Sequence, residues 1–153
     1  VVTRTTDVKP VADGIISVLE QIPDDKALDI VATGDGSARF QGEKQDLEEL
    51  IGNLLDNACK WAKSRIVLDV AVTSAGRSLP RRLVLTVDDD GPGLTAEQRA
   101  QGVKRGRRLD ETKPGSGLGL TIVTDLIETY KGTFRLDESP LGGLRVVVEL
   151  PAA

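Results

Sequence analysis

The sequence contains no histidine, no methionine and only one cysteine, Cys59. Without histidine, the chain offers no imidazole for acid–base catalysis, for metal binding or for accepting a phosphoryl group. A single cysteine cannot form an internal disulfide bond, which fits a reducing compartment. Because the chain starts at Val1 and lacks methionine altogether, we expect it to be a fragment of a longer protein.

Aromatic residues are also scarce, at 3% of the chain, so a core must be built from Leu, Val, Ile and Ala. No apolar run approaches the roughly 20 residues that cross a membrane as a helix, and no signal-peptide pattern is present. The 153 residues, of which 39% are hydrophobic and 29% charged, suffice for one globular domain. We therefore expect residues 1–153 to form a single domain.

The net charge of −4 disfavours general nucleic-acid binding, and no nucleic-acid partner is expected. The charge is unevenly distributed, because residues 101–113 (QGVKRGRRLDETK) hold five Lys and Arg against two Asp and Glu. Such a basic segment on an acidic chain indicates a local anionic ligand. An ordinary solvated loop is the alternative interpretation.

Hydrophobic periodicity predicts helices separated by short strands. The Gly-, Pro- and charge-rich residues 91–116 are predicted to be mostly loop. The order of the elements predicts an α+β fold, a two-layer α/β sandwich in which helices cover one face of a mixed sheet. Helices are predicted at 8–23, 44–62 and 117–132, and strands at 27–32, 38–41, 65–73, 81–89, 133–139 and 142–151.

The predicted helix at 44–62 carries an unusual polar stripe. At about 100° per residue, Asn53, Asn57 and Lys60 lie close together, away from the side that faces the core. Asparagine is a poor helix former, and a solvated face more naturally uses Glu, Lys and Arg. Because amide oxygens can bind Mg²⁺ and a lysine can meet a phosphate, the stripe is either such a site or a plain polar surface. The core-facing residues are predicted to be Leu47, Leu50, Leu54 and Ala58.

Two glycine-rich turns are further candidates for a binding site. In VDDDGPGL, residues 87–94, Asp89 ends an apolar strand, and Gly91 and Gly93 permit a tight turn close to a ligand. Carboxylates repel phosphate but accept N–H donors such as the amino group of adenine, with an ordinary Asp-rich turn as the alternative. In KPGSGLGLTIV, residues 113–123, glycines precede a helix N-terminus that favours phosphate, although a Walker-type lysine is absent.

Together these motifs resemble those of the ATP-binding domain of sensor histidine kinases, a family related to DNA gyrase and MutL. GNLLDNACKW (52–61) is similar to the N box of that family, DDDGPG (88–93) to its G1 box and GSGLGL (115–120) to its G2 box. Three segments look most like the PhoQ type of this family: the residues of the N box, the KRGRR segment and the LGG near the C-terminus. The resemblance covers about residues 5–150 and implies a Bergerat-type ATP-binding fold.

The resemblance implies ATP and Mg²⁺ as cofactors and suggests roles for individual residues. Asn57 and Asn53 would hold Mg²⁺, and Lys60 would reach the phosphates. Asp89 would accept a hydrogen bond from the adenine amino group, and residues 94–114 would form a mobile lid. The other nucleotide-binding residues that it implies are Trp61, Gly91, Gly93, Leu94, Arg105, Arg108, Gly117, Leu118, Gly119 and Leu120.

Two departures from the family pattern stand out. Val103 takes the place of the usual Phe in the lid, which implies looser closure, and the helical hairpin with the phosphoaccepting histidine is missing. The implied partners are therefore a His-bearing dimerisation domain of the same kinase and a response regulator. The whole kinase would be a homodimer in the inner membrane, with this domain in the cytoplasm.

Asn53 also bears on the reaction, because gyrase-like ATPases have there a Glu that activates water. Asparagine activates water poorly, so the resemblance favours transfer of the γ-phosphoryl group of ATP to a histidine over hydrolysis. A gyrase- or MutL-type ATPase is one alternative. A nucleotide-sensing interaction module without transfer chemistry is the other.

Overall fold

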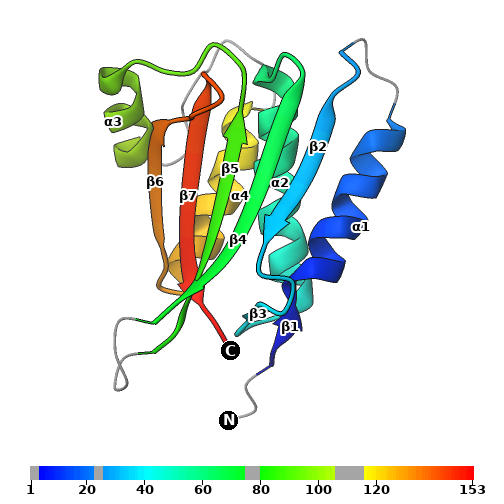
Figure 1. Cartoon of the computed structure of the whole chain (residues 1–153). Helices are drawn as coiled ribbons and strands as arrows, with labels where there is room; N and C mark the ends of the chain where they lie inside the picture. The colour runs from blue at the N-terminus through cyan, green and yellow to red at the C-terminus, as the bar shows by residue number, and fades with distance from the viewer. Residues whose placement is uncertain (1–3, 23–25, 75–79, 106–115) are drawn as a thin grey trace.

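The structure, a computed structural model, describes residues 4–22, 26–74, 80–105 and 116–153, with the backbone alone at 101–105 and 116–120. Within these ranges, a mixed sheet has the strand order β2-β4-β5-β7-β6, and helices α1, α2 and α4 cover one of its faces (Figure 1). β2 and β4 are parallel, and the other neighbours are antiparallel. The strands are β2 (Asp29–Gly34), β4 (Arg65–Thr73), β5 (Arg82–Asp89), β6 (Thr133–Glu138) and β7 (Leu144–Pro151).

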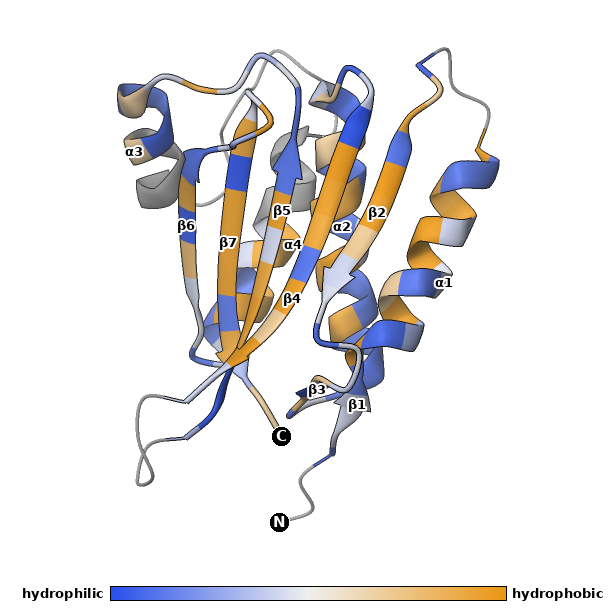
Figure 2. Cartoon of the chain, in the orientation of Figure 1, coloured by the Kyte–Doolittle hydropathy of each residue, from blue (hydrophilic) through white to orange (hydrophobic). Residues whose placement is uncertain are grey.

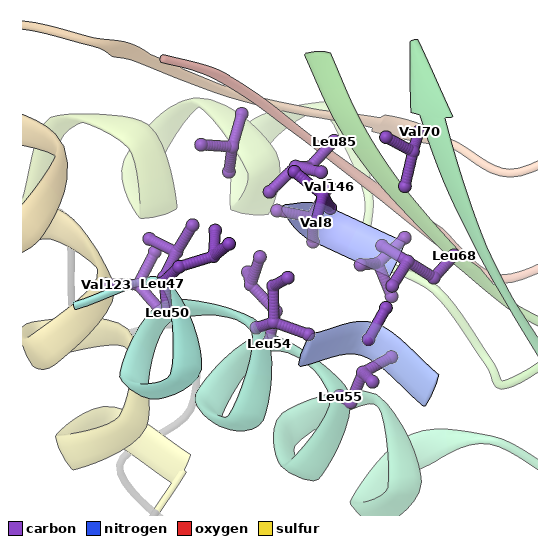
Figure 3. Packing of buried hydrophobic residues seen from close by; sticks show 14 of the residues in the cluster. Val8, Leu47, Leu50, Leu54, Leu55, Leu68, Val70, Leu85, Val123 and Val146 are labelled. Atoms are coloured by element: carbon purple, nitrogen blue, oxygen red, sulfur yellow. The ribbon is translucent and has the colours of Figure 1, made fainter. Parts of the chain in front are cut away.

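The core lies between this sheet and the helices α1 (Val8–Gln21), α2 (Lys44–Trp61) and α4 (Ser116–Thr129) (Figure 3). Residues alternate along β4, so that Ile66, Leu68 and Val70 are buried while their neighbours in the strand are more exposed. Bands of hydrophobic residues run along the central strands (Figure 2). The predicted core-facing residues of α2 are all buried, which confirms that part of the helix prediction: Leu47, Leu50, Leu54 and Ala58.

The prediction of a loop was wrong for residues 96–105, which form α3 (Ala96–Arg105) beside the edge strand β6 (Figure 1). This helix begins with a reciprocal capping box. The Gln98 N–H donates to Thr95 Oγ1 at 3.1 Å, and the Thr95 N–H donates to Gln98 Oε1 at 2.9 Å. Arg99 fastens the same turn by donating to the Leu94 carbonyl at 2.7 Å.

A two-stranded ribbon at the N-terminal side was only half predicted. β1 (Thr6–Asp7) pairs with β3 (Arg39–Phe40), whereas only the second of these strands was expected. Two residues carry too little periodicity to predict a strand, and their pairing depends on a contact distant in sequence. None of the helices within the described ranges is both long and apolar enough to cross a lipid bilayer.

Candidate functional site

The end of β5 and the last turn of α2 enclose a small pocket. Its volume is about 20 Å³, enough for about one water-sized sphere. The walls are formed by the residues Asn57, Trp61, Asp89, Pro92, Gly93, Leu94 and Leu144.

Asp89 is the buried acid of this pocket, with 3% of its surface exposed. Its Oδ1 accepts hydrogen bonds from the backbone N–H groups of Gly91, at 2.9 Å, and Leu144, at 3.2 Å. No hydrogen bond from the described residues reaches Oδ2. Burial raises the pKa of Asp89. The two backbone hydrogen bonds act to lower this pKa, and the neighbouring carboxylates of Asp90 and Asp88 act to raise it. The residue therefore has one oxygen fixed by the protein and one that can accept a donor from a ligand.

Close backbone approaches shape the turn around Asp89. A Cβ atom on Gly91 would lie 2.3 Å from the Trp61 carbonyl oxygen, and one on Gly143 would lie 2.1 Å from Asp89 Oδ1. Gly93 has φ +71°, which side chains rarely adopt. Glycine is thus required at three places around one carboxylate. Gly143 and Leu144 were not predicted as site residues, although the LGG ahead of the last strand was noted.

Asn57 presents the second unsatisfied oxygen of the pocket. It is 6% exposed, and its Oδ1 has no hydrogen-bond partner among the described residues. Asn53, one turn earlier, donates from Nδ2 to the Glu49 carbonyl at 2.7 Å. The described ranges contain no cluster of three His, Cys, Asp or Glu that could hold a metal. An orphan amide oxygen instead suits a hard cation whose remaining ligands are phosphate oxygens and water.

Asp90, which sequence reasoning missed, joins the two walls of the pocket. Its carboxylate accepts from the Lys63 N–H at 2.8 Å, the Ser64 N–H at 3.0 Å and the Ser64 hydroxyl at 2.6 Å. Burial is the largest single influence and opposes ionisation. The hydrogen bonds from the Ser64 side chain and from the backbone of residues 63–65 outweigh it and hold the pKa of Asp90 far below its usual range.

Residues 42–153 match the model of a family described as the histidine kinase-, DNA gyrase B-, and HSP90-like ATPases. This chain belongs to that ATPase family. The match confirms the predicted family, and the mixed sheet with helices on one face confirms the predicted fold class.

Individual members of the ATPase family agree with this assignment. The chain is 52% identical over 113 residues to the sensor protein kinase CarS of Pseudomonas aeruginosa, covering 74% of this chain and 24% of that protein. It is 36% identical over 141 residues to the sensor protein PhoQ of Escherichia coli, covering 92% and 28%. The crystal structure of the ATP-binding domain of PrrB from Mycobacterium tuberculosis aligns with a TM-score of 0.76 at 25% identity, covering 99% and 98%. The chain thus spans about a quarter of the length of its curated relatives.

The structure brings only part of the predicted site of this ATPase-family chain together. Asn57, Trp61, Asp89, Gly93 and Leu94 line one pocket, and Gly91 forms the turn beneath it.

Lys60 and Asn53 are not among the residues that line the Asp89 pocket. Lys60 forms an ion pair with Asp56 at 3.6 Å and lines a second, larger hollow of about 510 Å³, together with Lys26 and Cys59. The predicted contacts of Lys60 and Asn53 with a ligand stay predictions.

The predicted phosphate-binding residues lie outside this pocket or beyond the described part of the chain. Gly117, Leu118, Gly119 and Leu120 belong to the first turn of α4, where helix N–H groups lack intrahelical partners. Arg105 is the last residue of α3, and only its backbone is described. Arg108 and the rest of the predicted lid, residues 106–115, lie outside the described residues. Their contacts with a nucleotide remain predictions.

Proposed function

We propose that this chain binds Mg·ATP at the Asp89 pocket and supplies its γ-phosphoryl group to a histidine on another domain of a sensor histidine kinase. The observation that carries the proposal is the half-satisfied carboxylate of Asp89. One oxygen is held by two backbone N–H groups, and no described residue donates to the other. Membership of an ATPase family, with sensor kinases among the relatives, gives this pocket its expected ligand.

Adenine suits the pocket chemically. Its amino group would donate to Asp89 Oδ2, whereas guanine would present a carbonyl oxygen to the same acceptor. Trp61, Pro92 and Leu94 would contact the faces of the base, and their displacement would open the small pocket.

Asn57 fits a role as the protein ligand of Mg²⁺, because its buried Oδ1 has no partner among the described residues. Asn53 would add a second amide oxygen, since its Nδ2 is already engaged with the Glu49 carbonyl. Bound Mg²⁺ would neutralise charge on the β- and γ-phosphates. Lys60 would approach the phosphates if it left its ion pair with Asp56, which is partly exposed and therefore weak.

The G2-like turn and the basic lid would complete the phosphate site. The N–H groups at the start of α4, in residues 117–120, would donate to phosphate oxygens, with help from the helix dipole. Arg105 and Arg108 would add charge-assisted hydrogen bonds.

The chain itself has no histidine to phosphorylate, and Asn53 stands where gyrase-like ATPases have the Glu that activates water. Its residues would hold ATP in position and neutralise its charge while a separate domain brings the acceptor. We infer that this acceptor is the His-bearing dimerisation domain of the same kinase and that a response regulator takes the phosphoryl group onward. The full-length protein would be a homodimer anchored in the inner membrane, with this domain in the cytoplasm.

Three measurements test the proposal. Calorimetry should show that the chain binds ADP and a non-hydrolysable ATP analogue, the latter more tightly with Mg²⁺. The chain should phosphorylate an added His-bearing dimerisation domain, yet release phosphate from ATP alone far more slowly than about 1 s⁻¹, the low end for ordinary enzymes. Absence of nucleotide binding would refute the proposal. Turnover at or above that rate without an acceptor would favour the gyrase- or MutL-type ATPase, and binding without transfer would favour a sensing module.

A further inference from the structure

The last turn of α2 is fastened to the rest of the protein on both sides. Lys26 donates from Nζ to the carbonyl oxygens of Cys59, at 2.9 Å, and Lys60, at 3.0 Å. A cation at this end of a helix is also favoured by the helix dipole. The chain then leaves the helix, and the next free amides, at residues 63 and 64, donate to the carboxylate of Asp90. Between these two attachments lies Trp61, a wall of the Asp89 pocket.

Asp90 directly follows Asp89 in the chain, and the two carboxylates serve different elements. Asp89 lines the pocket, whereas Asp90 binds the turn between α2 and β4. Beside this attachment, the backbone of α2 comes so close to Gly91 that a Cβ there would lie 2.3 Å from the Trp61 carbonyl oxygen. Asp90 therefore acts at the place where the two walls of the pocket touch.

We propose that Asp90 is a positioning residue for nucleotide binding, which sets the distance between the wall that carries Asn57 and Trp61 and the wall that carries Asp89. It would not touch the nucleotide. This inference rests on the proposed nucleotide site and adds a residue that determines how well that site is formed. Its physical basis is that two N–H donors and one hydroxyl, all from the exit of α2, converge on one side chain.

The hydrogen-bond pattern predicts which substitutions matter. In Asp90→Ala all acceptors are lost, so the exit of α2 is released. In Asp90→Asn the amide oxygen can still accept from the amides of Lys63 and Ser64, and the amide N–H can donate to the Ser64 hydroxyl. Asparagine should therefore rescue the position, because the geometry rather than the negative charge is required.

A matched control lies at the other end of the sheet. Asp35 also accepts from a serine, through the Ser37 N–H at 2.8 Å and the Ser37 hydroxyl at 2.7 Å. It follows Gly34, which pairs with Val70, four residues along β4 from Ile66, the partner of Asp89. Asp35→Ala thus removes a similar set of hydrogen bonds far from the pocket.

The test measures the dissociation constant of ADP by calorimetry and the fluorescence of Trp61, the single tryptophan of the chain. Asp90→Ala should weaken ADP about tenfold or more, the effect of losing roughly one hydrogen bond to a charged group. It should also shift the Trp61 emission to longer wavelength without ADP. Asp90→Asn should stay within about threefold of the wild type, and Asp35→Ala should match the wild type in both readouts.

The possible outcomes separate this inference from the proposed function. If the wild-type chain does not bind ADP, the proposed function fails and the inference fails with it. If the wild type binds ADP and Asp90→Ala binds it equally well, only the inference is overturned. Equal losses of affinity in Asp90→Ala and Asp35→Ala would also overturn it, because they would indicate a general loss of stability. If Asp90→Ala does not fold, Ser64→Ala, which removes the 2.6 Å bond alone, should still weaken ADP measurably, and unchanged affinity would refute the inference.

Discussion

Replacing Asp89 by Asn separates the contribution of this residue to ligand binding from its contribution to folding. Asn can keep the acceptor that receives the N–H groups of Gly91 and Leu144, so the turn should survive. It places an NH₂ group where Oδ2 now lies. This group would face the amino group of adenine, and because both are donors, no hydrogen bond would form between them. Loss of a hydrogen bond to a charged group costs about 1.5–3 kcal/mol, so ADP should bind roughly 10- to 150-fold more weakly.

The stability of the Asp89→Asn variant should not fall, because burial already disfavours the ionised carboxylate and raises its pKa. Asp88→Asn is the matched control. Asp88 is the preceding residue, and it accepts two hydrogen bonds from Arg145, at 2.8 and 2.9 Å, instead of lining the pocket. Weakening these hydrogen bonds in Asp88→Asn should lower the free energy of unfolding by about 1–3 kcal/mol and leave ADP affinity intact. Calorimetry measures the affinity for ADP, and urea unfolding measures the stability of each variant. Unchanged ADP affinity in Asp89→Asn would refute the assignment of adenine to this pocket.

Three further predictions follow from the same structure. Because burial raises the pKa of Asp89 above the ordinary 3.8, the folded state holds the proton of this residue more tightly than the unfolded state. As the pH falls through the raised pKa, ADP titrations should show weaker binding, while protonation relieves the unfavourable burial of the charge. Asp89→Asn should lack both effects. Asn57→Leu should leave the urea midpoint unchanged or raise it, since it removes an orphan buried oxygen, but calorimetry should show that Mg²⁺ no longer strengthens binding of the ATP analogue. Leu85→Ala, at a fully buried position of β5, should lower the free energy of unfolding by about 2–5 kcal/mol in urea titrations, and a loss below about 1 kcal/mol would contradict the close packing of Leu85 in the core.

Elements with strong periodicity could be predicted from the sequence with little error. β4 spans Arg65–Thr73 as predicted, and α2 ends at Trp61, one residue before its predicted end. In both elements, alternation between buried and exposed residues follows directly from the geometry of a strand or helix on one core. The family could be predicted as well, because three short motifs occur in one order over most of the chain.

α3 was missed because the composition of residues 91–116 suggested a loop, and its mean hydropathy is low. The local signal was the capping pair of Thr95, which directly precedes the ten helical residues 96–105, and Gln98 in the first turn of that helix. That pattern would have placed the helix start correctly.

The site was harder to predict than the fold, since its residues depend on contacts distant in sequence. Gly143 and Leu144 approach Asp89 only because β7 pairs with β5. Asp90 looked like one acid in a run of three, and its role depends on the turn 63–64 lying beside it. The sequence placed Lys60 on the right helix, but it could not predict which of the two hollows this side chain lines.

Strand β7 is translated last among the strands of the main sheet, yet it lies between β5 and β6. While a nascent chain still lacks residues 143–151, β5 has an open edge and β6 lacks the neighbour with which it pairs. The Leu144 N–H that fixes Asp89 is also missing at that stage. The pocket proposed to bind nucleotide can therefore form only after the last strand of this sheet has been synthesised. A premature stop codon ahead of Gly143 should yield a chain with an exposed strand edge, prone to aggregation and open to proteolysis, rather than a weakened ATP-binding domain.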